Sequence, residues 1–119
     1  MAGEDHWPTA IRLADQGKTL NIDFESGENF SLPAEFLRVS SPSAEVQGHD
    51  PSQRITVPGK KNVAIASVEP VGNYAVRLAF DDGHGSGFYT WTYLHELGAR
   101  QAELWAAYLD DLAAKKLQR

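Results

Sequence analysis

The sequence predicts an α+β domain: a small antiparallel β-sheet, built from hairpins, packed against a C-terminal helix. Two periodicities predict it. Apolar residues alternate with polar ones along several segments between residues 19 and 91, which is typical of half-buried strands. Over residues 102–112 they recur at spacings of three and four, which is typical of a helix. The 119 residues include three Trp, four Tyr and five Phe, enough for one hydrophobic core.

The first half of the chain predicts a β-hairpin within residues 19–32. Apolar side chains alternate with polar ones before a Ser-Gly turn and return after it, at Leu20, Ile22, Phe24, Phe30 and Leu32. A short strand at residues 11–13 precedes the hairpin, and residues 33–38 suit a helical turn that starts with proline. We take residues 1–8 as a loose leader and residues 9–119 as a single domain.

The second half predicts further strands and two helices. Strands are expected at residues 63–68, 74–80 and 88–91, then a helix from Thr92 that stops at Gly98, and finally the long C-terminal helix. The predicted core consists of the apolar face of these elements: Phe24, Tyr74, Val76, Leu78, Phe80, Leu104 and Leu109.

Composition excludes several classes of function. The 16 acidic and 11 basic side chains give a formal charge of −5, which argues against nucleic-acid binding. One basic cluster, Arg54 with Lys60 and Lys61, is interpreted as a solvated loop. Without cysteine the chain has no disulfide, no thiolate-bound iron–sulfur cluster and no cysteine nucleophile. The acidic start lacks signal-peptide features and no apolar run could span a bilayer, so we expect a cytoplasmic protein that does not bind membranes.

Residues 81–87 carry the densest group of chemically capable side chains. Asp81, Asp82, His84 and Ser86 alternate with glycines there, and carboxylates with an imidazole can bind a metal or transfer protons. Asp and Gly after a strand are also what a tight turn requires, and this interpretation is favoured. The segment lacks the lysine and the following helix of a phosphate-binding loop, and Ser86 has no nucleophile-elbow pattern.

Two other features have both a functional and a structural interpretation. Arg38 borders a serine-rich loop, where it either binds an anion or, as is commoner, pairs with Glu35 or Glu45. The alternating aromatic residues of the strand at 88–91 and its continuation form either a ligand wall or, preferably, packing contacts: Tyr89, Trp91 and Tyr93.

Two motifs resemble a known family. They are Leu37-Arg38-Val39-Ser40-Ser41-Pro42-Ser43-Ala44-Glu45, and Val71-Gly72-Asn73-Tyr74-Ala75-Val76 followed by residues 80–91, Phe-Asp-Asp-Gly-His-Gly-Ser-Gly-Phe-Tyr-Thr-Trp. Together they resemble the gamma-butyrobetaine hydroxylase-like N-terminal domain, a small bacterial domain of unknown function, over residues 9–98. In the hydroxylases this domain precedes a separate iron- and 2-oxoglutarate-dependent catalytic domain, which this chain is too short to contain. The resemblance therefore implies no hydroxylase activity here.

The resemblance also implies a lost zinc site. In the hydroxylases the domain binds zinc through three cysteines and one histidine. The positions that match the cysteines are Ser41, Ser43 and Val46, and only the histidine persists, as His84. Serine is a poor zinc ligand and valine is none. We therefore expect no metal and no cofactor.

The resemblance suggests a partner as well, because the same domain occurs as an appendage of P-loop ATPases that carry iron–sulfur clusters. The leading hypothesis is a non-enzymatic binding or adaptor domain accessory to such metal-cofactor machinery. The alternatives are a small-ligand or metal-dependent enzyme, with its site between loops 38–49 and 81–86, and a structural dimerisation module. The oligomeric state is open. The candidate ligand-binding residues come from the two motifs: Arg38, Ser41, Ser43, Asp82, His84 and Ser86.

The loss of the zinc ligands predicts that the domain folds without metal, because no coordination bond contributes to its folding free energy. Thermal melts with and without a strong chelator should coincide. A clear fall in melting temperature with the chelator would contradict this prediction.

Overall fold

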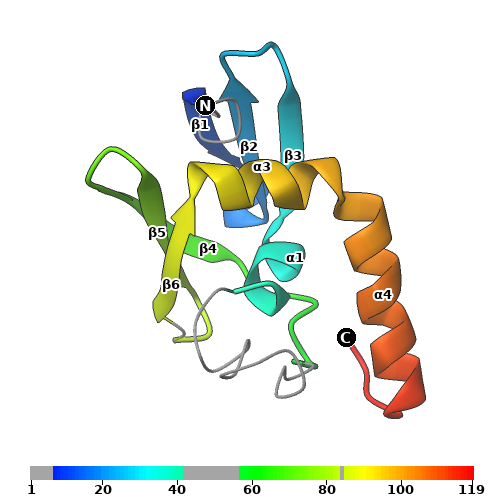
Figure 1. Ribbon diagram of the computed structural model, residues 1–119. Coiled ribbons are helices and arrows are strands. Elements are labelled where there is room, and N and C mark those ends of the chain that lie inside the picture. Colours follow the sequence, from blue (N-terminus) through cyan, green and yellow to red (C-terminus); the bar gives the residue numbers. More distant parts are fainter. Residues whose placement is uncertain (1–6, 42–56, 84) are drawn as a thin grey trace.

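The computed structural model describes residues 7–41, 57–83 and 85–119 and confirms the α+β class. Its strands divide into two three-stranded antiparallel sheets, in the orders β1-β2-β3 and β4-β5-β6 (Figure 1). In chain order the elements are β1 (Pro8–Ala14), the 3-10 turn η2 (Asp15–Gly17), β2 (Thr19–Phe24), β3 (Asn29–Pro33), α1 (Ala34–Val39), β4 (Ile65–Val71), β5 (Ala75–Phe80), β6 (Gly85–Thr90), α3 (Trp91–Ala99) and α4 (Gln101–Ala114).

The first sheet follows the predicted alternation. Ile22 pairs with Ile11 on one side and with Phe30 on the other, and Leu20 pairs with Leu32. On the opposite face Ser31 Oγ donates a 2.8 Å hydrogen bond to Asn21 Oδ1. One face is therefore apolar and turned to the core, while the other is polar, as a half-covered antiparallel sheet requires.

The second sheet buries Val76, Leu78 and Phe80 of β5, as predicted. Tyr74 is 53 % exposed, so the prediction that it belongs to the core is wrong. It lies in the turn between β4 and β5, one residue before β5 begins, where the alternation of the strand no longer determines which way a side chain points. The outward row of the sheet includes Arg77, whose Nη2 lies 2.7 Å from Glu69 Oε1.

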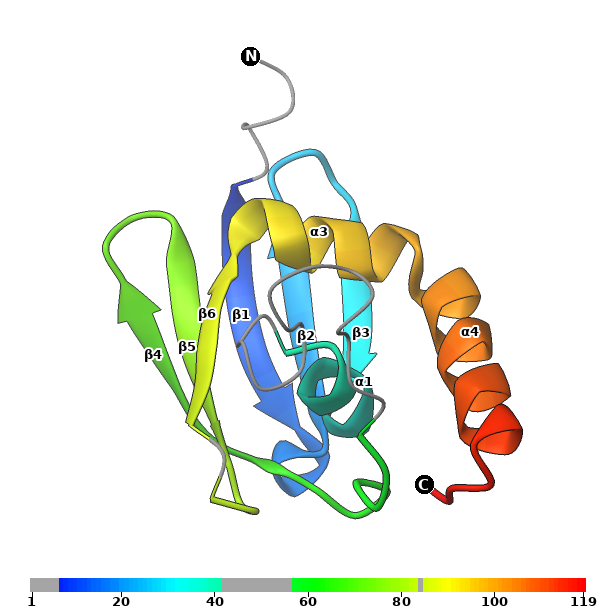
Figure 2. The ribbon, with the colours of Figure 1, turned by 60° about the horizontal axis from the view of Figure 1, so that its bottom comes forward.

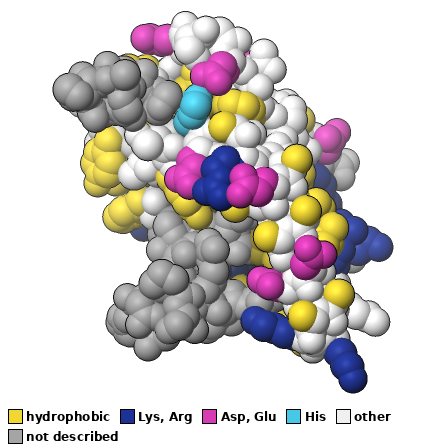
Figure 3. All heavy atoms as spheres, turned by 45° about the vertical axis from the view of Figure 1, so that its right-hand side comes forward, with side chains coloured by type: hydrophobic (Ala, Val, Ile, Leu, Met, Phe, Trp, Pro, Cys, Tyr) yellow, Lys and Arg dark blue, Asp and Glu magenta, His cyan; other side chains and the backbone are white. Residues whose placement is uncertain are grey.

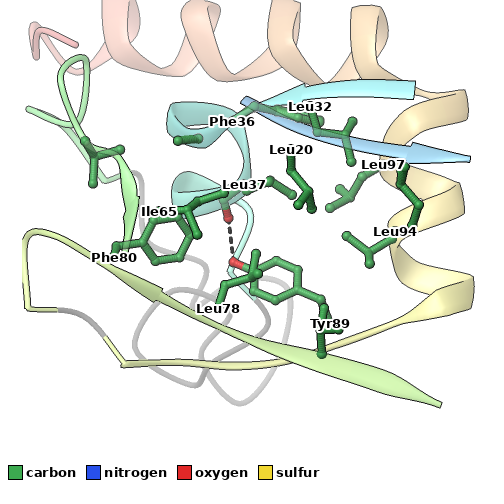
Figure 4. Packing of buried hydrophobic residues seen from close by; sticks show 14 of the residues in the cluster. Leu20, Leu32, Phe36, Leu37, Ile65, Leu78, Phe80, Tyr89, Leu94 and Leu97 are labelled. Atoms are coloured by element: carbon green, nitrogen blue, oxygen red, sulfur yellow. Dashed lines mark hydrogen bonds between the residues drawn. The ribbon is translucent and has the colours of Figure 1, made fainter. Parts of the chain in front are cut away.

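The core lies between the two sheets and around α1. In Figure 4 side chains from both sheets and from α3 point toward the short helix, which contributes Phe36 and Leu37. All five residues from Ala34 to Arg38 are buried. Figure 2 shows α1 beside the first sheet, with α3 crossing above it. A six-residue helix thus has its polar groups inside the protein, away from water.

Helix α3 begins earlier than predicted, since Trp91 is its first residue rather than the end of a strand. The Thr90 hydroxyl accepts a 3.1 Å hydrogen bond from Tyr93 N and caps the helix. Gly98 lies inside the last turn and does not stop the helix. A Cβ atom on Gly98 would lie 2.3 Å from Cγ of Phe30, so glycine is needed here for the close packing of α3 on β3.

Helix α4 packs beside α1 instead of covering a sheet, through an edge contact between Trp105 and Phe36 whose ring centroids are 6.1 Å apart. For this reason Leu104 is only partly buried and Leu109 is 38 % exposed, whereas both were predicted in the core. Leu112 is the buried residue of this helix. None of the described helices is both long and apolar enough to cross a membrane.

The face that carries α3 and α4 mixes charges of both signs with scattered apolar side chains (Figure 3). Arg100, between the two helices, lies 3.1 Å from Glu96 and 2.8 Å from Glu103. The hydrogen bond from Arg100 lowers the pKa of the Glu103 carboxyl. These pairs are exposed to solvent and contribute little to the stability of the fold.

We expect Leu78→Ala to lower the free energy of unfolding by ~2–5 kcal/mol, because Leu78 is fully buried and its truncation leaves a cavity. Leu109→Ala removes the same atoms from an exposed position and should cost less than ~1 kcal/mol. Denaturant unfolding of both variants checks this pair. Equal losses would contradict the packing described above.

Candidate functional site

The two family motifs meet where the end of α1 approaches the β5–β6 turn. We call this place the junction: residues Leu37–Ser41, Lys60, the turn Asp81–Gly83, Tyr89 and Tyr93. The turn is closed by a 3.2 Å hydrogen bond from Gly83 N to Phe80 O, and Gly83 has a φ of +87°, which favours glycine. The turn is thus held firmly against the strands that flank it.

Asp81 anchors the turn to the segment before β4. Its backbone N donates to Ala64 O at 2.9 Å, and its Oδ1 accepts from Ala64 N at 3.0 Å. The turn interpretation of this aspartate agrees with these contacts, since its carboxylate binds backbone.

A partly buried ion pair connects the two motifs. Arg38 Nε lies 2.9 Å from Asp82 Oδ2, and the Arg38 side chain is only 6 % exposed. Lys60 Nζ approaches the same oxygen at 2.6 Å. The Asp82 carboxylate therefore faces two cations, and with Asp81, the second carboxylate of the turn, the formal charges at the junction balance.

The predicted pairing of Arg38 inside the fold occurs, but with Asp82. Its predicted partner Glu35 is bound by Arg119, and Glu45 lies outside the described residues. The sequence predicts a solvated loop around Lys60 and does not predict its contact with Asp82. Its sequence signal is weak, because a lysine after Pro58-Gly59 resembles any surface turn.

Two tyrosine hydroxyls satisfy the carbonyl groups at the end of α1. Tyr89 donates a 2.6 Å hydrogen bond to Leu37 O (Figure 4), and Tyr93 donates one to Ser40 O at 2.5 Å. The last carbonyls of a helix lack partners within the helix, so they need such donors when buried. The indole of Trp91 donates to Asn73 O at 2.8 Å. The three aromatic residues therefore serve packing and hydrogen bonding, as the favoured interpretation held.

The candidate ligand-binding residues are only partly described. Arg38 and Asp82 are in contact. Ser41 follows Arg38 closely in the chain and is fully buried, and its N–H donates to Arg38 O at 3.3 Å. Ser43 and His84 lie outside the described residues. Ser86 is in β6, but its side chain is not described. A role of these residues in ligand binding stays a prediction.

The donor set at the family zinc position does not suit zinc. Ser41 is a fully buried hydroxyl where the hydroxylases have a thiolate, and the other cysteine positions are Ser43 and Val46. In the described segments no cluster of three or more His, Cys, Asp or Glu side chains could hold a metal ion.

The architecture defines a small α+β domain with two antiparallel sheets around a short buried helix, joined through two sequence motifs. The profile of the family described as "Gamma-butyrobetaine hydroxylase-like, N-terminal" matches residues 11–95, most of the chain. The chain belongs to this family. No protein among the curated ones compared with it matches the chain.

Solved structures share the fold. Two NMR solution structures each have a TM-score of 0.82 to this chain, with 50 % and 46 % sequence identity. They cover 96 % of this chain, which in turn covers 90 % and 85 % of theirs. A crystal structure from Acidithiobacillus ferrooxidans, described as a DUF971-family protein of unknown function, has a TM-score of 0.66 and 36 % identity; the match covers 81 % of this chain and 97 % of that one.

We expect Tyr89→Phe to lower the free energy of unfolding by ~1–3 kcal/mol, because it leaves the carbonyl of Leu37 buried without this donor. Tyr74→Phe is the matched control, since Tyr74 is 53 % exposed and should change stability by less than ~0.5 kcal/mol. Denaturant unfolding measures both. If the two variants are equally stable, the Tyr89 hydroxyl does not hold the junction together.

Proposed function

We propose that the chain is a non-enzymatic binding domain, and that the junction is the surface through which it binds a protein partner. The observation that carries the proposal is that the polar groups at the junction form hydrogen bonds with each other and with the backbone. Asp82 accepts hydrogen bonds from Arg38 and Lys60, and Asp81 accepts one from the backbone of Ala64. These contacts fix the relative positions of the two motifs. A surface held in this way is preorganised, which reduces the entropy lost on binding.

The rim of the junction is accessible to a partner. Asp81, Gly83 and Lys61 are exposed, and the Lys60 side chain is 22 % exposed. Charges at a rim steer association and select among partners more than they contribute to affinity. Polar groups fixed by hydrogen bonds at the centre of the junction, together with exposed charges at its rim, support a binding role.

The partner that we propose is a P-loop ATPase that carries an iron–sulfur cluster. The family resemblance supports this choice, because the domain occurs elsewhere as an appendage of such ATPases. The chain has no cysteine and therefore holds no cluster through thiolates. Its role in such an assembly is to contact the carrier protein.

The proposal predicts that a cluster-carrying ATPase from the same genome binds the ¹⁵N-labelled domain. Amide signals of the junction should shift on titration, with the largest changes at residues 38–41 and 81–83. Lys61→Glu should weaken binding several-fold, because it reverses an exposed charge at the rim. Arg100→Glu, which reverses a charge on the α3–α4 face, is the matched control and should leave the affinity unchanged.

Two outcomes contradict the proposal. An absence of shifts with the ATPase in excess excludes this partner. Shifts that cluster around α4 and leave the junction amides unchanged exclude the junction as the binding surface.

A further inference from the structure

A second place in the molecule, between α1 and α4, holds a buried carboxylate. Glu35 lies in the first turn of α1, and its side chain is only 7 % exposed. A carboxylate so far from water is costly unless a cation with well-placed donors is bound to it. Burial of Glu35 therefore requires a cation beside its carboxylate.

Arg119 supplies that cation in a two-pronged arrangement. Its Nη2 donates to Glu35 Oε1 at 2.7 Å and its Nε donates to Glu35 Oε2 at 3.0 Å. Two parallel bonds between a guanidinium and a carboxylate are specific to arginine, because an ammonium group cannot match both oxygens at once. The hydrogen bond to Glu35 raises the pKa of Arg119.

Aromatic rings complete the surroundings of the guanidinium. The guanidinium carbon of Arg119 lies 5.3 Å from the centroid of the Trp105 ring, within the range of a cation–π contact. The Tyr108 ring lies beside Trp105 at 5.2 Å between centroids, and its hydroxyl donates to Val57 O at 2.6 Å. Burial, with the charge of Glu35 as a second cause, raises the pKa of Tyr108 to about 12, so its hydroxyl stays a neutral donor.

The two sides of this contact differ in character. Glu35, Trp105 and Tyr108 belong to helices, whereas Arg119 follows α4 on residues 115–119, which turn back toward α1 in both ribbon views (Figures 1 and 2). Backbone hydrogen bonds from Leu117 N to Leu112 O and from Gly59 N to Gln118 O hold this segment near the site. The turn places Lys116 at a φ of +58°, unfavourable for a residue with a side chain. The Arg119 side chain is 44 % exposed, so the site opens to solvent on the side from which it enters.

We propose that Glu35, Trp105 and Tyr108 form a binding site for the guanidinium of an arginine side chain from another polypeptide, a site that Arg119 occupies in cis. The site combines a buried carboxylate with aromatic surface, the chemistry that selects a planar cation. It is separate from the junction and does not depend on the function proposed for it. An incoming arginine exchanges places with Arg119, whose side chain then moves into solvent.

Residues 115–119 attach Arg119 to the protein, and this attachment determines when another arginine can replace it. A residue held on a short segment competes as though present at an effective concentration on the order of millimolar. A single free arginine side chain is therefore a poor competitor for the intact protein. Removal of the Arg119 guanidinium should open the site to an added ligand.

The test uses Arg119→Ala and two ligands of equal charge, N-acetyl-arginine methylamide and N-acetyl-lysine methylamide. The readout is the indole N–H signal of Trp105 in ¹⁵N spectra, assigned by its loss in Trp105→Phe, at constant ionic strength. The arginine ligand should shift this signal saturably in the Arg119→Ala protein. The lysine ligand should bind at least ~10-fold more weakly, because it lacks the planar fork.

Two controls connect the response to the site. In the protein that keeps Arg119, the same shift should require at least ~10-fold more arginine ligand, because the tethered side chain competes. Adding Glu35→Gln to Arg119→Ala should abolish binding of the arginine ligand. If Arg119→Ala does not fold, Arg119→Lys replaces it, since a tethered ammonium forms only one prong and the arginine ligand should still displace it.

The proposal is overturned by any of three results. The folded variant does not bind the arginine ligand, it binds the arginine and lysine ligands equally, or its binding survives Glu35→Gln. In each case the contact between Glu35 and Arg119 only fastens residues 115–119 to the fold.

Discussion

The structure depends on one constraint: a short helix with two charged residues is buried between two sheets. Glu35 and Arg38 of α1 are 6 % and 5 % exposed, and the carbonyls at the end of the helix are buried with them. A helix of six residues satisfies few of its own polar groups, so the remaining groups must find partners elsewhere in the protein.

Those partners come from regions that lie far apart in the chain. The backbone N of Ala34 donates to Lys18 O before β2, Arg38 binds Asp82 in the β5–β6 turn, and Glu35 binds Arg119 after α4. Tyr89 and Tyr93 serve the far end of the helix. Hydrogen bonds thus join the buried helix to β6, to α3 and to the segments before β2 and after α4, in addition to its packing in the core.

This arrangement also explains why the two proposed sites lie at opposite ends of α1. Each site is built where a buried charge of the helix is neutralised, by Asp82 at the junction and by Arg119 beside α4. The partner of Arg38 comes from a turn that is hydrogen-bonded to the flanking strands, so the geometry of the junction is fixed. The partner of Glu35 comes from the segment after the last helix, so the exchange of Arg119 for another arginine is proposed there.

The sequence by itself determined the local features. The alternation in β2 and β5 predicted Leu20, Ile22, Val76 and Leu78 as inward residues, and the two motifs indicated the family, because both depend only on neighbouring residues. The tertiary structure decided which groups meet. Asp82 lies 44 residues from Arg38 in the chain, and Arg119 lies 84 residues from Glu35. A local pattern therefore predicted neither pair, and for Arg38 it indicated only the nearby residues Glu35 and Glu45. The exposure of Tyr74 and Leu109 was likewise decided by where β5 begins and by the placement of α4 beside α1, since burial depends on what packs against a residue as well as on its own type.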